Sequence, residues 1–240
     1  MELKEFTKKI KLKKIFKMTK EKVTDYIKNN YLFSVYLVLS VITTFTVRLL
    51  TTKSVFDYRP LITDLGLIII FGSFSLLYKT QKQKYTYLKV WLILYTAMGL
   101  ANDIYYAFYS SFASFSELSS LGQATGVTNS FIERIEISQF VYILAPVAFS
   151  FIYRRYTKKK SIFNFPQKDV KKKLRYTLII GLLFVLLSFS TTKIQDYSRL
   201  YKLWNRTYVV DRFGIITYEI MDSFTSVTTK SILFLVLKMP

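Results

Sequence analysis

The 240-residue chain contains no cysteine and no histidine, and it is poor in acidic residues, glycine and proline. Without cysteine the chain forms no disulfide and carries out no thiol chemistry. Without histidine it lacks the commonest general base and the commonest metal ligand. Only 15 Asp and Glu residues are present, so an oxygen-ligated metal site would draw on a small set. We therefore expect no metal site, and we assign no catalytic residue within the chain.

What the chain has in abundance is long apolar runs. Hydrophobic residues make up 51% of the sequence, and about 20 helical residues cross a hydrocarbon core of roughly 30 Å. The sequence therefore predicts an all-α, polytopic membrane protein with five transmembrane helices. Gly99 and Gly181 are expected to mark close packing between these helices. The five predicted spans are Leu32–Leu50, Leu61–Tyr78, Tyr87–Tyr109, Ile137–Tyr153 and Leu174–Ile194.

The net charge of +20 is distributed unevenly between the connections. Ten Lys lie in residues 1–30, four follow the second run, and ten Lys or Arg follow the fourth run, whereas the alternate connections hold three. Cytoplasmic connections carry the excess of positive charge, so we expect the N-terminus inside and the segment Gln195–Asp222 outside. A basic chain can also bind nucleic acid, but these charges flank apolar runs and no nucleic-acid fold signature is present. We expect no nucleic-acid partner.

Four regions follow from this pattern. Residues 1–30 form a basic juxtamembrane segment, either a helix lying on an anionic inner leaflet or a solvated tail that only sets topology. Residues 31–194 form the five-helix transmembrane domain. Residues 195–222 form an extracellular juxtamembrane segment, predicted to be helical because Leu200, Leu203 and Trp204 share a helical face. Residues 223–240 form a tail of different character.

Two stretches resemble a known family. Ala101–Gln123 leaves an apolar run through Asn102 and continues with paired tyrosines, an aromatic–aromatic–Ser step, Phe–x–x–Phe–Ser and a Gln. Arg206–Gly214 has a charged lead-in, an aromatic residue with valines and a glycine, and Tyr218 and Asp222 follow. Both stretches look like the N-terminal transmembrane domain of the lipoteichoic acid synthase family. The resemblance covers roughly residues 31–222.

The resemblance implies a role in the envelope of a bacterial cell, in a multi-pass protein of the cell membrane. Members of this sulfatase-like family transfer glycerol phosphate from phosphatidylglycerol to a lipid-anchored polymer, using a Thr nucleophile and manganese in an extracellular domain. The resemblance ends at Asp222, so it implies no catalytic residue and no cofactor in this chain. A truncated or frameshifted product is the leading interpretation, and a split gene or a short paralogue is the alternative.

Two functions are consistent with these observations. The chain is either the membrane part of a phosphoglycerol transferase, inactive alone, or a non-catalytic membrane protein. In the second case it acts as a scaffold or lipid-binding partner for a separately encoded enzyme or another cell-envelope protein. Membrane lipids, phosphatidylglycerol among them, are the expected ligands in both cases.

Each predicted span places a polar or charged residue near its outer end. Ionisable groups at a membrane edge usually pair with one another or serve a site. One hypothesis is a polar collar that holds an anionic lipid headgroup, with the planar guanidinium of Arg48 as its main cation. The alternative is a set of interfacial residues that snorkel or form structural ion pairs. The collar comprises Arg48, Asp64, Asn102, Asp103, Gln139 and Lys193.

Overall fold

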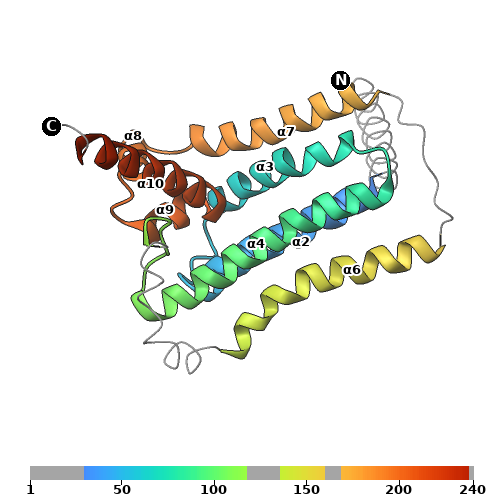
Figure 1. The fold of residues 1–240 in the computed structure, drawn as a ribbon, viewed down its shortest axis with the longest axis horizontal. Coiled ribbons are helices and arrows are strands. Elements are labelled where there is room, and N and C mark those ends of the chain that lie inside the picture. The colour runs from blue at the N-terminus through green and yellow to red at the C-terminus, as the bar shows by residue number, and fades with distance from the viewer. Residues whose placement is uncertain (1–29, 118–135, 160–168, 238–240) are drawn as a thin grey trace, which may run out of the picture.

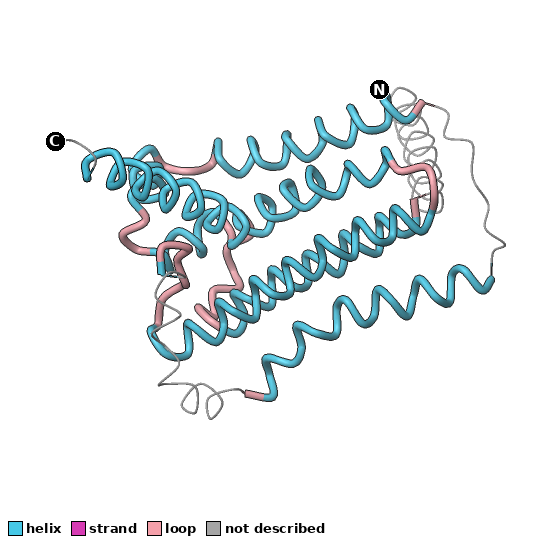
Figure 2. Tube along the Cα trace, in the orientation of Figure 1, coloured by secondary structure: helices cyan, strands magenta, loops and turns pink. Residues whose placement is uncertain are grey.

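The computed structural model describes residues 30–117, 136–159 and 169–237, and every regular element within them is a helix (Figures 1 and 2). The expectation of an all-α protein is confirmed for these residues. The basic segment 1–30 lies almost entirely outside them. The elements are α2 (Tyr31–Leu50), α3 (Arg59–Ser73), η1 (Phe74–Leu77), α4 (Gln81–Tyr109), η3 (Ile137–Phe140), α6 (Val141–Lys159), α7 (Val170–Ser190), α8 (Ile194–Lys202), α9 (Arg206–Phe213) and α10 (Ile215–Leu237).

Local sequence signals fix the ends of these helices. α4 begins with a reciprocal capping box, in which Thr80 Oγ1 accepts from Gln83 N at 3.2 Å and Gln83 Oε1 accepts from Thr80 N at 3.4 Å. It therefore starts six residues before the predicted boundary at Tyr87. Ser110, in the left-handed region with φ of +51°, ends it. α3 has Pro60 in its first turn, where the missing N–H has no helical partner to lose.

The helix in the fifth predicted span ends earlier than predicted. α7 stops at Ser190 rather than at Ile194. The hydroxyl groups of Thr191 and Thr192 donate to the carbonyl oxygen of Ser188 at 2.8 and 3.1 Å, an alternative to continued helix. Lys193 consequently does not end a span; it is the residue before α8.

Four helical segments are long and apolar enough to cross a membrane. α4 is longer than any of them, but its Tyr, Trp, Asn and Asp residues lower its mean hydropathy and it is not in this set. The expectation of a multi-pass membrane protein is therefore supported with four candidate spans among the described residues, rather than five. They are Tyr31–Leu50, Arg59–Leu77, Ile137–Thr157 and Val170–Ser190.

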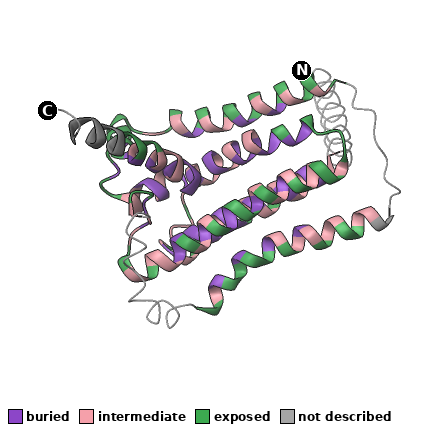
Figure 3. Cartoon of the chain, in the orientation of Figure 1, coloured by how far each residue is buried: buried purple, intermediate pink, exposed green. Residues whose placement is uncertain are grey.

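The long helices lie side by side, with α7 and α6 on opposite flanks of α2, α3 and α4 (Figure 1). α3 contacts α7 and α2, and α4 contacts α2 and α6. α2, α3 and α4 carry most of the buried residues, whereas α6 and α7 leave broad faces uncovered (Figure 3). The three C-terminal helices α8, α9 and α10 gather at one end of the bundle, called here the α10 end (Figure 1).

Glycines allow the closest helix contacts. A Cβ on Gly66 would lie 2.8 Å from the carbonyl oxygen of Gly181, and a Cβ on Gly181 would lie 2.9 Å from that of Gly66. α3 and α7 therefore touch through their backbones. A Cβ on Gly99 would come within 2.9 Å of the ring of Tyr142. The predicted packing roles of Gly99 and Gly181 are confirmed.

Candidate functional site

Asp64, in the second turn of α3, caps a helix far along the chain. Its Oδ1 accepts a hydrogen bond from the backbone N–H of Ile216, in the first turn of α10, at 3.2 Å. A carboxylate at this position satisfies an otherwise unpaired N–H and is favoured by the helix dipole. Gly214 brings its backbone against the carboxylate, because a Cβ there would fall on the Asp64 side chain. Asp64 therefore joins α3 to α10.

Arg48, at the end of α2, is completely buried. Its Nη1 donates to the carbonyl oxygen of Asp57 at 3.1 Å, and its acidic neighbours are Asp64, Asp211 and Asp57. Thr52 donates to Asp211 Oδ1 at 2.6 Å and holds that carboxylate in place. Nε and Nη2 of Arg48 form no hydrogen bond with the described residues. Arg48 thus acts as an internal counter-charge for several carboxylates.

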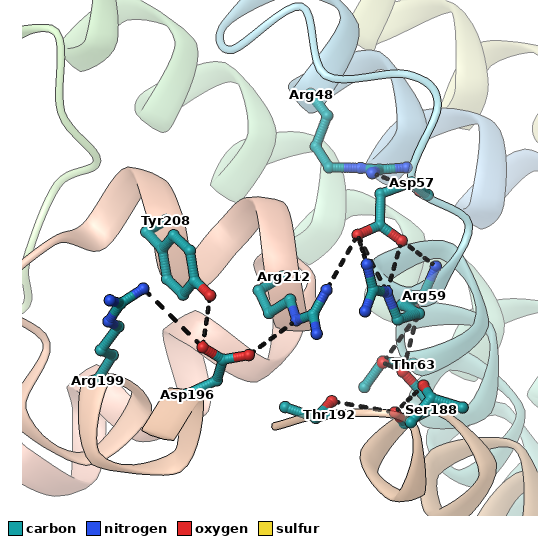
Figure 4. A network of polar contacts seen from close by, with 11 residues as sticks. Arg48, Asp57, Arg59, Thr63, Ser188, Thr192, Asp196, Arg199, Tyr208 and Arg212 are labelled. Carbon is teal, nitrogen blue, oxygen red and sulfur yellow. Dashed lines mark hydrogen bonds and ion pairs between the residues drawn. The ribbon is translucent and has the colours of Figure 1, made fainter. Parts of the chain in front are cut away.

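A chain of ionic contacts continues from this point into α8 and α9 (Figure 4). Arg59 Nη2 lies 2.7 Å from Asp57 Oδ2, and Arg212 Nη1 lies 3.6 Å from the same oxygen. Arg212 Nε is 3.2 Å from Asp196 Oδ2, and the hydroxyl of Tyr208 donates to Asp196 Oδ1 at 2.5 Å. Alternating charges therefore connect the loop before α3 to both short helices.

The carboxylates of Asp57 and Asp196, which take part in these ionic contacts, are held in their ionised form. Burial acts to raise the pKa of Asp57, but the hydrogen bonds and charge of Arg59 and the charge of Arg212 outweigh it and lower the pKa. Burial likewise acts to raise the pKa of Asp196, and the hydrogen bond from Tyr208 with the neighbouring positive charges lowers it. Both groups therefore remain charged partners at neutral pH.

A second polar cluster surrounds the end of α4. Asn102 Nδ2 donates to Glu219 Oε1 at 2.5 Å, and Asn102 Oδ1 accepts from the backbone N–H of Ala113 at 3.1 Å. The Asp222 carboxylate accepts from Ser114 Oγ at 2.7 Å and from the next backbone N–H at 2.6 Å. The segment after α4 therefore folds back onto α10.

Arg206 strengthens this attachment from α9. Its Nη1 lies 2.8 Å from Glu117 Oε1 and donates to the carbonyl oxygen of Phe112 at 2.9 Å. Tyr218 donates through its hydroxyl to the carbonyl oxygen of Ala113 at 2.5 Å. Phe112 itself is completely buried.

The structure divides the six predicted collar residues between several environments. Arg48 and Asp64 lie near one another, while Asn102 belongs to the second cluster. Asp103 is buried on α4, with Glu136 and Tyr142 as its electrostatic neighbours. Gln139 is buried in η3, and its Oε1 has no partner among the described residues. Lys193 is exposed beside α8. The headgroup role of the collar stays a prediction.

An open-sided groove lies next to the second cluster. It has a volume of about 460 Å³ and is bounded by α3, α4, the segment Ala113–Phe115 and α10. One end of the groove is formed by the stacked rings of Phe71 and Trp91, whose centroids are 4.4 Å apart. Asn102 and Glu219 line its other end. The volume falls within the range of small-molecule sites.

The carboxyl group of Glu219 has an altered affinity for its proton. Burial raises the pKa of Glu219 to about 7. The hydrogen bond from Asn102 opposes this rise, and the charge of Asp222 adds to it. This side chain therefore changes charge close to neutral pH.

The manganese that the family resemblance implies has no ligand set in the described part of the chain. Over residues 30–117, 136–159 and 169–237, no group of three or more His, Cys, Asp or Glu side chains is arranged to hold a metal ion. We derive no metal-dependent step from these residues.

Taken together, these features define a polytopic α-helical membrane domain whose following segment folds into the helices α8, α9 and α10 and docks onto one end of the bundle. The sequence matches the lipoteichoic acid synthase N-terminal domain over residues 8–232, and the chain belongs to this family. Comparison with curated proteins and with solved structures gives no match.

Several residues of the site were not predicted from the sequence. Asp57, Arg212 and Asp196 form the ionic chain, and Glu219 and Asp222 anchor the second cluster. One sequence pattern could have indicated them: acidic and basic residues alternate through the segment 195–222, which is typical of a surface that forms ion pairs.

Proposed function

We propose that the chain is a five-span membrane module with its N-terminus inside, and that α4 is the fifth span. α4 has 29 residues, about 43 Å at 1.5 Å per residue, which exceeds a hydrocarbon core of roughly 30 Å. It packs against α2 and α6, which are themselves candidate spans. With five spans, the excess of Lys and Arg falls on one side, and the α10 end lies outside.

Reporter fusions test this topology. A reporter active only in the cytoplasm should be silent when fused after Asp222 and active when fused after Lys159, because an odd number of spans separates the N-terminus from Asp222. The fusion after Lys159 also controls for expression. Activity of the Asp222 fusion would contradict the five-span arrangement.

We propose further that this module serves lipoteichoic-acid-type phosphoglycerol transfer in a bacterial cell membrane by holding the α8–α10 segment at a fixed position on the outer face. The observation that carries this proposal is the cap that Asp64 forms on α10, supported by the contact of Arg212 with Asp57. These bonds orient α9 and α10 relative to the spans. Catalytic groups that follow or bind this segment would then meet the membrane in a defined orientation.

A second candidate is a scaffold or lipid-binding partner of a separately encoded enzyme. The open-sided groove beside α4 and α10 favours this function, because it offers a largely apolar site along α4, the proposed fifth span. The two candidates share the same architecture and differ in whether the catalytic groups belong to the same polypeptide.

The 240 residues alone are expected to catalyse no transfer or phosphodiester cleavage. The reason for this expectation is that the whole sequence contains no histidine, and histidine is a ligand type that the family's metal site uses. The purified chain should release no glycerol phosphate from phosphatidylglycerol with or without manganese, as measured by enzymatic detection of the product. A metal-dependent release that is lost on heating would contradict this expectation, and a heated sample serves as the control.

A further inference from the structure

The groove between α4 and α10 has the length of one lipid tail. Its lining on α4 runs from Trp91 to Asn102, which is about 16 Å along the helix axis. Half of a hydrocarbon core of roughly 30 Å is a similar distance, and one acyl chain fills one leaflet. Ala97 and Ala101 lie between these ends, and their small side chains leave the space open.

The deep end of the groove is apolar and the other end is polar. Phe71 and Trp91 close the deep end with stacked rings. Asn102, Ser114 and Glu219 lie at the polar end. A molecule that matches both ends has an apolar tail and a polar head, which is the form of a membrane lipid.

The charge at the polar end selects among headgroups. None of the described residues that line the groove is basic. Arg206, the basic residue of the neighbouring cluster, is already paired with Glu117. Glu219 lines this end, and the buried carboxylate of Asp222 lies near enough to act on its charge, so a phosphate would meet negative charge without a compensating cation.

A hydroxyl group suits this end better than a phosphate. Oε1 of Glu219 accepts the hydrogen bond from Asn102, and the described residues form no other hydrogen bond to this carboxyl group. Its second oxygen is therefore available to accept a bond from a hydroxyl donor. A diacylglycerol carries such a hydroxyl directly on its glycerol backbone, whereas the headgroup hydroxyls of phosphatidylglycerol lie beyond a negatively charged phosphate.

We propose that the groove binds one acyl chain of an uncharged lipid with a hydroxylated headgroup, such as a diacylglycerol. The tail lies against Phe71 and Trp91, and a headgroup hydroxyl donates to Glu219. This binding goes beyond the proposed module function and does not depend on whether the chain supports transferase chemistry.

The intrinsic fluorescence of Trp91 provides the test. The chain has two tryptophans, and Trp204 is 83% exposed outside the groove, so Trp204→Phe leaves Trp91 as the single reporter. This variant is placed in phosphatidylcholine vesicles that contain brominated diacylglycerol, brominated phosphatidylglycerol or brominated phosphatidylcholine in equal amounts. The measurement is made roughly one pH unit above the pKa of Glu219, where most of these carboxyl groups are ionised.

We expect brominated diacylglycerol to quench Trp91 with an apparent affinity about tenfold higher than either phospholipid, the scale of one hydrogen bond to a charged group. Ala97→Phe, which fills the groove, should reduce this quenching to the level of the phospholipids. Val38→Phe adds the same ring to an exposed face of α2 and should change nothing. If Ala97→Phe does not fold, Ala101→Leu fills the groove in its place.

Glu219→Gln separates the headgroup preference from simple contact with lipid. Gln keeps the acceptor for Asn102 and removes the charge, so quenching by brominated phosphatidylglycerol should rise toward that of diacylglycerol. Equal quenching of the Trp204→Phe protein by all three lipids would show bulk contact only. A preference for phosphatidylglycerol would show an anionic site, and either result would overturn the proposal.

Discussion

Replacement of Gly214 by Ala is expected to be strongly destabilising. Gly214 ends α9 and precedes α10 with φ of +92° and ψ of 160°, a backbone region that is essentially restricted to glycine. A Cβ there would also fall on the carboxylate of Asp64 and displace the cap of α10. Backbone strain of about 1–3 kcal/mol and an unsatisfied buried carboxylate of similar cost together predict a loss of roughly 3 kcal/mol or more.

The stability of Gly214→Ala is measured by thermal unfolding of the purified chain in detergent, and proteolysis after residue 205 reports on α9 and α10. Lys53→Ala is the matched control, because Lys53 also has a positive φ, of +57°, but is exposed. It should unfold like the wild type. A Gly214→Ala protein as stable as this control would show that α10 is held by other contacts.

Arg48→Met is expected to cost about 3–5 kcal/mol of stability, the cost of breaking a buried charge pair from one side. The reason is that Arg48 is completely buried and its positive charge acts on Asp64, Asp211 and Asp57, which would lose this neighbouring charge. Unfolding in detergent provides the measurement. Arg155→Met, at an exposed position on α6, is the control and should have little effect.

Two further variants distinguish an internal counter-charge from a lipid site. Asp64→Asn in the Arg48→Met background should recover part of the lost stability, because it removes one unpaired charge. Arg48→Lys keeps the charge and loses the planar fork. If it retains phosphatidylglycerol in native mass spectrometry as the wild type does, Arg48 serves structure. Selective loss of phosphatidylglycerol with unchanged stability would favour the headgroup hypothesis.

Much of the fold could be predicted because membrane-crossing length and helix signals are local. The run that became α2 was predicted to within one residue. The common depth of Arg48 and Asp64 followed from counting residues along two antiparallel spans, and the structure places these side chains near one another. Lys193 was misplaced because the helix ends at Ser190, where threonine hydroxyls bond to the carbonyl oxygen of Ser188.

The partners of the site were harder to predict, since they come together across long sequence separations. Nothing in the periodicity of α3 indicates that Asp64 meets the backbone 152 residues further on. The pairing of Asn102 with Glu219 spans 117 residues and depends on how α10 docks. Residue periodicity gives the face of a helix and not the helix that it meets.

The ten residues 57–66, which comprise the end of the loop before α3 and its first turns, hold attachments to three other helices. Asp57 meets α9, Thr63 donates to Ser188 of α7 at 2.6 Å, Asp64 caps α10, and Gly66 touches the backbone of α7. We therefore expect these helices to follow α3 when its orientation changes. Because spanning helices change their tilt when bilayer thickness changes, a thinner or thicker membrane would turn α9 and α10 by the same angle as α3. We therefore expect a change in membrane thickness to alter the orientation of the helices at the surface of the domain.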